Sequence, residues 1–317
     1  MEKRRLGRTG FSIAPLVIGG NVFGWTADER ESFAILDAFV DHGINAIDTA
    51  DVYSSWADGN KGGESETVIG KWLRARPGLR DKLVMITKVG SDLGAPGQKG
   101  LSDRWIREAV EGSLSRLGID AIDVYLSHWP DNETPYAETL GAYADLMQDG
   151  KIKAIGASNL DAEQLAMSLR VARDNSLPAY QVVEPEYSLV MRGKFEGALQ
   201  DLCVENDIGV VSYYALSAGF LTGKYRTEAD LQKGSRGSSV KRYMTPKGLD
   251  VLKAASAVAE GHGVSETEVA LAWVMAQKGI TAPIASASRI DQVATLIAAT
   301  KLRLTADDLA HLDAASA

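Results

Sequence analysis

Short apolar segments alternate with amphipathic helical patterns along most of the chain. The apolar segments fall at 15–18, 44–48, 83–87, 122–127, 152–157, 180–183, 208–213 and 283–285. Each is followed by a segment with apolar residues at helical spacing, such as 102–117 or 135–148. Strands separated by helices are joined by crossover connections, which make neighbouring strands parallel. The pattern therefore predicts an α/β protein with eight parallel strands.

Eight strand-helix units in 317 residues favour one closed barrel. The alternative is an open doubly wound sheet, but the glycines at 19–24 do not form the Gly-x-Gly-x-x-Gly pattern expected after its first strand. A glycine-bounded turn at 7–10 predicts an N-terminal β-hairpin, and helical patterns after 246 predict extra C-terminal helices. We expect a single-domain (β/α)8 TIM barrel over residues 1–317.

Composition narrows the class of protein. A formal net charge of -8 argues against nucleic acid or an anionic membrane as a partner. Cys203 is the only cysteine, which excludes an internal disulfide and a cysteine metal cluster. We expect no bound metal, no segment that spans a membrane and a cytoplasmic location, and the oligomeric state stays open.

Ionisable side chains stand where three successive strands end. Asp48 and Tyr53 follow the second strand, Lys88 ends the third and His128 ends the fourth. Parallel neighbours would bring these groups to one rim of the barrel. An ammonium group beside a phenol lowers the phenol's pKa, and Asp48 would keep Lys88 charged. We therefore expect Tyr53 to act as a proton donor to a developing oxyanion, with His128 bonded to the same oxygen.

Each of these residues also has a structural interpretation. Asp48 could cap a turn and Tyr53 could be an aromatic residue of the rim. Lysine is rarely buried without a partner, which favours a functional Lys88. Trp25, Trp56 and Trp129 follow strand ends, and they could line an apolar substrate cavity or pack in the core.

Several short motifs, in order along the chain, resemble the aldo-keto reductases, in the bacterial type related to the potassium-channel β-subunit branch. They lie at 47–53, 63–66, 87–88, 126–130, 156–159, at Gln181 with 186–188, and at 219–224. The resemblance implies a barrel that binds NADPH in an extended pose. It assigns Tyr53 as general acid, tuned by Lys88 and Asp48, and His128 as the residue that orients the carbonyl group.

The resemblance also implies the cofactor contacts. Gly20, Asn21 and Asp48 are expected to contact the cofactor, Ser158, Asn159 and Gln181 match residues that bind the nicotinamide carboxamide, and Tyr213 matches the aromatic residue that stacks on the ring. The residues matched to the pyrophosphate are Leu216, Ser217, Gly219, Leu221 and Lys224. Those matched to the adenosine end are Ser286, Ser288, Arg289 and Gln292. A 2'-phosphate in an acidic protein needs a fixed guanidinium group, so Arg289 favours NADP over NAD.

The predicted function is NADPH-dependent reduction of an aldehyde or ketone, a small-molecule carbonyl substrate. The resemblance also covers channel β subunits, so a cofactor-binding sensor with little turnover is the alternative. A third hypothesis is a Schiff-base aldolase that uses Lys88 as its nucleophile.

Overall fold

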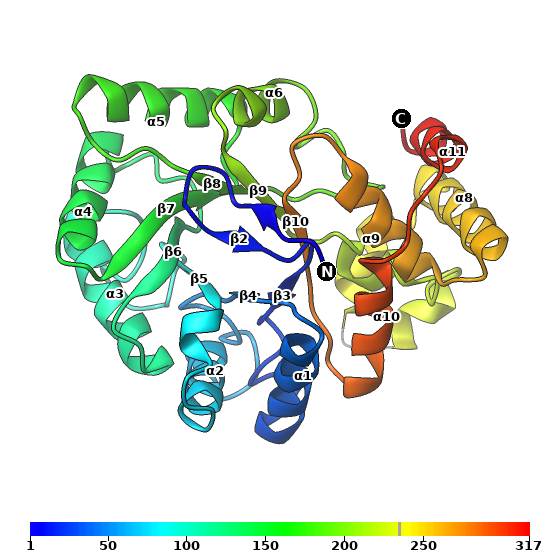
Figure 1. The fold of residues 1–317 in the computed structure, drawn as a ribbon, viewed down its shortest axis with the longest axis horizontal. Coiled ribbons are helices and arrows are strands. Elements are labelled where there is room, and N and C mark those ends of the chain that lie inside the picture. The colour runs from blue at the N-terminus through cyan, green and yellow to red at the C-terminus, as the bar shows by residue number, and fades with distance from the viewer. Residues whose placement is uncertain (234–235) are drawn as a thin grey trace.

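Eight parallel strands form a closed barrel in the computed structural model, which describes residues 1–233 and 236–317 (Figure 1). The order around the barrel is β10-β3-β4-β5-β6-β7-β8-β9, so strands adjacent in sequence are adjacent in space. The barrel strands are β3 Val17–Gly19, β4 Ala46–Asp48, β5 Val84–Val89, β6 Ile122–Ser127, β7 Ile152–Ser158, β8 Val182–Glu184, β9 Gly209–Ser212 and β10 Ala282–Ala285. This confirms the predicted (β/α)8 architecture.

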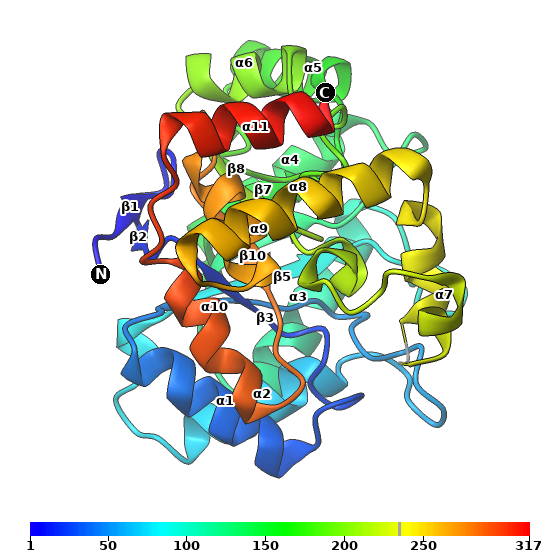
Figure 2. The same cartoon turned by 90° about the vertical axis from the view of Figure 1, so that its right-hand side faces the viewer.

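Helices surround the barrel and bury an apolar layer against its outer face (Figure 1). They are α1 Glu29–Asp41, α2 Glu64–Arg74, α3 Asp103–Leu117, α4 Tyr136–Gln148, α5 Ala162–Asp174, α6 Ala198–Glu205, α8 Pro246–His262, α9 Glu266–Ala276, α10 Val293–Ala299 and α11 Ala306–Ser316. Side-chain caps fix where several of them begin: Ser102 accepts from the Trp105 N–H, and Asp161 and Ser265 form capping boxes. In Figure 2, α8 and α11 lie together on one side of the barrel.

The interior of the barrel is a separate apolar cluster. Its members come from alternate positions of the strands, including Val17, Ala46, Ile86 and Val182. Side chains two positions apart on a strand point to the same face. These residues therefore form the floor on which the site is built.

The predicted hairpin closes one end of this interior. Strands β1 Arg4–Arg5 and β2 Ser12–Ile13 pair antiparallel, and Leu6 and Ile13 join the interior cluster. Arg4 donates hydrogen bonds to the carbonyl oxygens of Met275 and Thr281. Gly7 leaves no room for a side chain, because a Cβ there would lie 2.3 Å from the Gly209 nitrogen. In Figure 1 the hairpin (dark blue) lies over the barrel end that faces the viewer.

The segment 217–246, between β9 and α8, contains short helical turns. They are η2 Ser217–Thr222, η3 Glu228–Lys233, α7 Gly237–Val240 and η4 Lys241–Tyr243, with η1 Arg80–Lys82 and η5 Ile290–Gln292 elsewhere. Positions 234–235 of this segment lie outside the described residues. No helix in the described part of the chain is both long and apolar enough to cross a membrane.

Candidate active site

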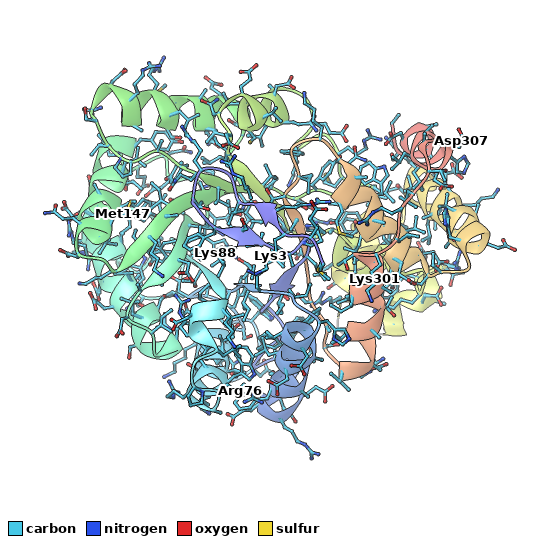
Figure 3. All side chains as sticks on the ribbon, in the orientation of Figure 1. Lys3, Arg76, Lys88, Met147, Lys301 and Asp307 are labelled. Atoms are coloured by element: carbon cyan, nitrogen blue, oxygen red, sulfur yellow. The ribbon has the colours of Figure 1, made fainter. Side chains whose placement is uncertain are left out.

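The strand ends carry the polar residues of the site, each two positions after an interior apolar residue. Pairs of this kind are Ala46 and Asp48, Ile86 and Lys88, Leu126 and His128, Val182 and Glu184, and Val211 and Tyr213. The alternation of a strand places both members of a pair inside the barrel. Figure 3 shows Lys88 within the ring of helices, in contrast to Arg76 and Asp307 at the periphery.

Lys88 is the centre of the site. Its side chain is fully buried, and Nζ lies 2.5 Å from Asp48 Oδ1, 2.9 Å from Tyr53 Oη and 3.0 Å from the Thr49 carbonyl oxygen. Burial lowers the pKa of Lys88, but the nearby Asp48 and Glu184 outweigh burial and raise it above its ordinary value. The structure therefore joins Asp48, Tyr53 and Lys88 in one cluster, with Lys88 as a permanent ammonium group.

The pKa of Tyr53 departs from the expectation. Burial raises it well above its ordinary value, the charge of Asp48 raises it further, and Lys88 opposes both without overcoming them. The expected net lowering by Lys88 is therefore wrong for this arrangement, although the ammonium group acts in the expected direction. The consequence is a phenol that keeps its proton at neutral pH, as a proton donor must.

Glu184 is a fourth member of the cluster that the sequence interpretation missed. Its side chain is 2% exposed, and Oε1 lies 3.3 Å from Lys88 Nζ. The Oε2 atom has no hydrogen-bond partner among the described residues. Burial raises the pKa of Glu184 well above its ordinary value, and the neighbouring Asp48 adds to the increase. A missed signal pointed to it, because Glu184 stands two positions after the interior residue Val182 at a strand end.

His128 lies beside Tyr53, with ring centroids 5.9 Å apart. Burial lowers its pKa well below the ordinary value, and Lys88 adds to the effect, so the imidazole is neutral at pH 7. Ser91 Oγ lies 3.0 Å from Nδ1 and fixes the orientation of the ring. A neutral ring held in this way can donate one hydrogen bond toward the cavity.

These groups open into a cavity of about 810 Å³ at the carboxyl ends of the strands. Most of the predicted site residues line it. They are Asn21, Asp48, Tyr53, Trp56, His128, Trp129, Ser158, Asn159, Tyr213, Leu216, Gly219, Lys224, Ser286, Ser288, Arg289 and Gln292. Residues more than 200 positions apart in sequence thus share one long cavity.

One wall of the cavity is a chain of hydrogen bonds. Tyr213 Oη donates to Asn159 Oδ1 at 2.7 Å, and Asn159 Nδ2 donates to the His128 carbonyl oxygen at 2.9 Å. Ser158 Oγ donates to the Glu184 carbonyl oxygen. Asn159 is held at a positive φ of 64°, a conformation that asparagine tolerates better than most residues. The wall presents fixed polar groups beside Tyr53.

Aromatic rings also line the cavity. Trp56 is exposed and contacts Tyr53 and Trp25 edge to face, at centroid distances of 5.9 Å and 5.7 Å. Trp129 stacks on His128. Trp25 itself does not line the cavity, but it contacts two residues that do, Trp56 and Arg236. An apolar substrate group fits against these rings.

Three basic side chains line the cavity close to one another. Lys224, Arg236 and Arg289 lie close enough that the two arginines lower the pKa of Lys224, after burial as the main cause. Arg236 lies over the Trp25 ring. Arg289 is exposed and pairs with Asp291. The arrangement suits a ligand with several anionic groups, and Arg236 was not among the predicted residues.

Five predicted residues besides Lys88 do not line the cavity: Gly20, Trp25, Gln181, Ser217 and Leu221. Gln181 is misplaced, because it precedes β8 at the hairpin end of the barrel and donates to the Arg8 carbonyl oxygen. Successive side chains of a strand point to opposite faces. Val182 and Glu184 face the barrel interior, so Gln181 is not on the interior face. Leu221 is a buried residue of the hydrophobic core. Ser217 is also buried, and its Oγ atom forms a hydrogen bond with Ser188 Oγ.

Glu186 is a second buried acid, and it belongs to the motif at 186–188. It is 3% exposed, bonds Lys194 Nζ at 2.8 Å and Arg242 Nη2 at 2.6 Å, and accepts from Tyr243 Oη at 2.8 Å. These contacts tie η4 to the end of β8. Among the described residues, no group of three or more His, Cys, Asp or Glu side chains is arranged to hold a metal ion.

A parallel barrel that gathers a phenol, an ammonium group and buried carboxyl groups at the carboxyl ends of its strands has the arrangement typical of barrel enzymes, whose working residues lie at that end. The profile of the Aldo/keto reductase family matches residues 15–317. The chain is 32% identical to protein tas of Escherichia coli over 339 residues, which cover 99% of this chain and 97% of that protein. It is also 32% identical to the uncharacterized oxidoreductase YrpG of Bacillus subtilis over 321 residues, 99% of this chain and 95% of the relative.

A third relative is a Schizosaccharomyces pombe protein named for a voltage-gated potassium channel subunit beta, 31% identical over 98% of this chain and 92% of its own length. This chain belongs to the aldo/keto reductase family and is an oxidoreductase of that type.

Proposed function

We propose that the chain reduces aldehydes or ketones to alcohols with NADPH, and that Tyr53 is the general acid. The observation that carries the proposal is the protonated phenol of Tyr53, 2.9 Å from the Lys88 ammonium group and open to the cavity. A bound reduced nicotinamide would supply the hydride for the carbonyl carbon. The proton for the carbonyl oxygen comes from Tyr53 Oη.

Each neighbour has a defined part in this proton transfer. Lys88 stabilises the tyrosinate that remains after the proton has left, and Asp48 holds Lys88 in place. His128, neutral and oriented by Ser91, donates a hydrogen bond that positions the carbonyl oxygen. Trp56 and Trp129 shield the reacting carbonyl group from water.

The cavity suits the cofactor that the family implies. It runs from Asp48 to Arg289, and Lys224, Arg236 and Arg289 provide cations for the phosphate groups. Gly219, at a φ of 97°, lets the backbone approach the phosphates closely. Ser158 and Asn159 would hold the carboxamide, and Tyr213 would stack on the nicotinamide ring. An Arg289 guanidinium group beside Ser288 supports a preference for NADP.

The alternatives to this proposal are a cofactor-binding sensor and a Schiff-base aldolase. The relative named for a channel subunit beta supports the sensor, which would bind NADPH without turnover. A Schiff-base aldolase is disfavoured, because the raised pKa of Lys88 keeps the amine protonated and non-nucleophilic.

The test compares Tyr53→Phe with the wild type in two assays, NADPH binding by fluorescence and NADPH oxidation with a panel of carbonyl compounds. We expect turnover to fall at least about 100-fold, the lower range for loss of a general acid, with NADPH binding within about twofold. Tyr136→Phe, on α4 and away from the cavity, is the control. Equal loss of binding and turnover would contradict the assignment, and NADPH binding without turnover in the wild type would favour the sensor.

A further inference from the structure

Two buried carboxyl groups share one ammonium group in this site. Asp48 comes from β4 and Glu184 from β8, and both contact Lys88 Nζ, at 2.5 Å and 3.3 Å. Both carboxyl side chains are buried, at 2% exposure each, so water does not screen their charges. One ammonium group can neutralise only one of two negative charges, and a buried carboxylate without a compensating charge is strongly disfavoured. One of the two carboxyl groups is therefore expected to be protonated.

The surroundings decide which group holds the proton. Asp48 receives the shorter contact from Lys88, and Oδ2 also accepts from Tyr53 Oη at 3.3 Å. Glu184 has the longer contact, and its Oε2 atom has no partner within the described chain. Other titratable groups near Glu184 do not offset its charge: Tyr213, directly after β9, and Tyr53 are both neutral phenols. The geometry favours an ionised Asp48 and a neutral Glu184.

We propose that Glu184 is a positioning residue that carries a proton, so that Lys88 faces one negative charge, that of Asp48, instead of two. The location of the proton is independent of the reaction. Its consequence for catalysis rests on the proposed function.

The consequence concerns Tyr53. Asp48 and Glu184 both raise the pKa of Tyr53 when they are charged, whereas Lys88 lowers it. If Glu184 loses its proton at alkaline pH, a second negative charge appears beside Tyr53, and the phenol becomes a weaker acid. Carbonyl reduction should then slow as pH rises through the pKa of Glu184, which lies well above its ordinary value.

Infrared spectroscopy of the ligand-free protein locates the proton without any need for turnover. We expect a carboxylic-acid carbonyl band at neutral pH that shifts when the protein is labelled with ¹³C-glutamate and is missing in Glu184→Gln. The label separates this band from that of Asp51, an aspartate whose pKa is also raised. The label works in the wild type, so the test stands even if the variant does not fold. A spectrum with no glutamic-acid band at neutral pH would overturn the proposal.

The pH profile of kcat tests the positioning role. We expect wild-type kcat to fall at least about tenfold in total as pH rises through the pKa of Glu184, and this decrease to be lost in Glu184→Gln, whose amide cannot ionise. Glu186→Gln is the matched control, because Glu186 is a buried acid on the same segment that is paired with Lys194 and Arg242, so the decrease should persist. A decrease that persists in Glu184→Gln refutes the role. If no carbonyl compound is reduced by the wild type, the proposed function fails while the infrared result still decides where the proton lies.

Discussion

Asp51 is an aspartate buried in the turn between Asp48 and Tyr53, and its replacement by asparagine should stabilise the protein. The side chain is 1% exposed, and neither carboxylate oxygen has a well-formed hydrogen bond to any described residue. Burial, assisted by the charge of Glu66, raises the pKa of Asp51 to about 8. Arg116 opposes the shift, but it is bonded to Glu66. Ionised Asp51 is thus strongly disfavoured in the folded protein.

The magnitude follows from linkage between proton binding and folding. In the unfolded chain Asp51 has a pKa near 4, so between about pH 4 and pH 8 the folded state binds the proton more tightly than the unfolded state. The contribution of protonated Asp51 to the free energy of unfolding is complete below about pH 4, and it is lost progressively as pH rises to about 8. Each pH unit in that window lowers the free energy of unfolding by about 1.4 kcal/mol, or about 4 kcal/mol from pH 5 to pH 8. Relaxation around a buried charge reduces this to about 2 kcal/mol.

The assay is urea unfolding of the wild type and Asp51→Asn at pH 5 and pH 8, followed by circular dichroism. We expect the advantage of Asp51→Asn to be about 2 kcal/mol larger at pH 8 than at pH 5. Asp81→Asn, at an exposed aspartate, is the control and should show no such dependence. An advantage that is equal at the two pH values, or a less stable variant at pH 8, would refute the reasoning.

Two further predictions concern packing and cofactor preference. Gly156→Ala should destabilise the barrel by about 2 kcal/mol in urea unfolding, because the new Cβ would lie 2.4 Å from the Val182 carbonyl oxygen and 2.5 Å from Leu126 Cδ2, whereas Gly141→Ala, on α4 with open space around it, should be neutral or stabilising. Wild-type stability in Gly156→Ala would show that β7 and β8 can separate at little cost. Arg289→Ala should weaken NADPH binding about tenfold in a fluorescence titration and leave NADH binding unchanged, since only NADPH carries the 2'-phosphate. Equal weakening of both would remove Arg289 from the phosphate site.

The fold could be predicted from the sequence because its signal is local and repeated. Each strand is a short apolar segment that is followed by a helix, and caps such as Ser102 and Thr305 mark where helices begin. Asp48, Lys88 and His128 were visible for the same reason, because each ends such a segment. The spacing of these residues needed no knowledge of distant contacts.

The alternation of strand positions would have corrected one error. The family resemblance matched Gln181 to a residue that binds the carboxamide, but the interior residue Val182 shows which strand positions face the barrel interior, and Glu184 is the polar residue on that face. Gln181, at the hairpin end of the barrel, and Glu184, in the active site, are three positions apart along the chain. The position of each residue in the strand's alternation distinguishes Glu184 from Gln181.

Other features could not be predicted, because they depend on long-range packing. Arg236 and Arg242 belong to a segment without a clear periodic pattern, and their partners Trp25 and Glu186 are distant in sequence. The raised pKa of Tyr53 likewise depends on burial and on Glu184, which belongs to β8 and is distant from Tyr53 in sequence. Composition and spacing carry no information on these distances.

The hairpin that closes the barrel also constrains the order of assembly. Arg4 bonds the carbonyl oxygens of Met275 and Thr281, and Gly7 packs against Gly209. During synthesis the hairpin leaves the ribosome long before these partners have been made, and domains form as their segments emerge. Its two short strands therefore lack these tertiary contacts until the region of the last barrel strand, β10, has been synthesised. Closure of the barrel and docking of the hairpin are therefore late events that depend on each other, even though the hairpin precedes every strand of the barrel.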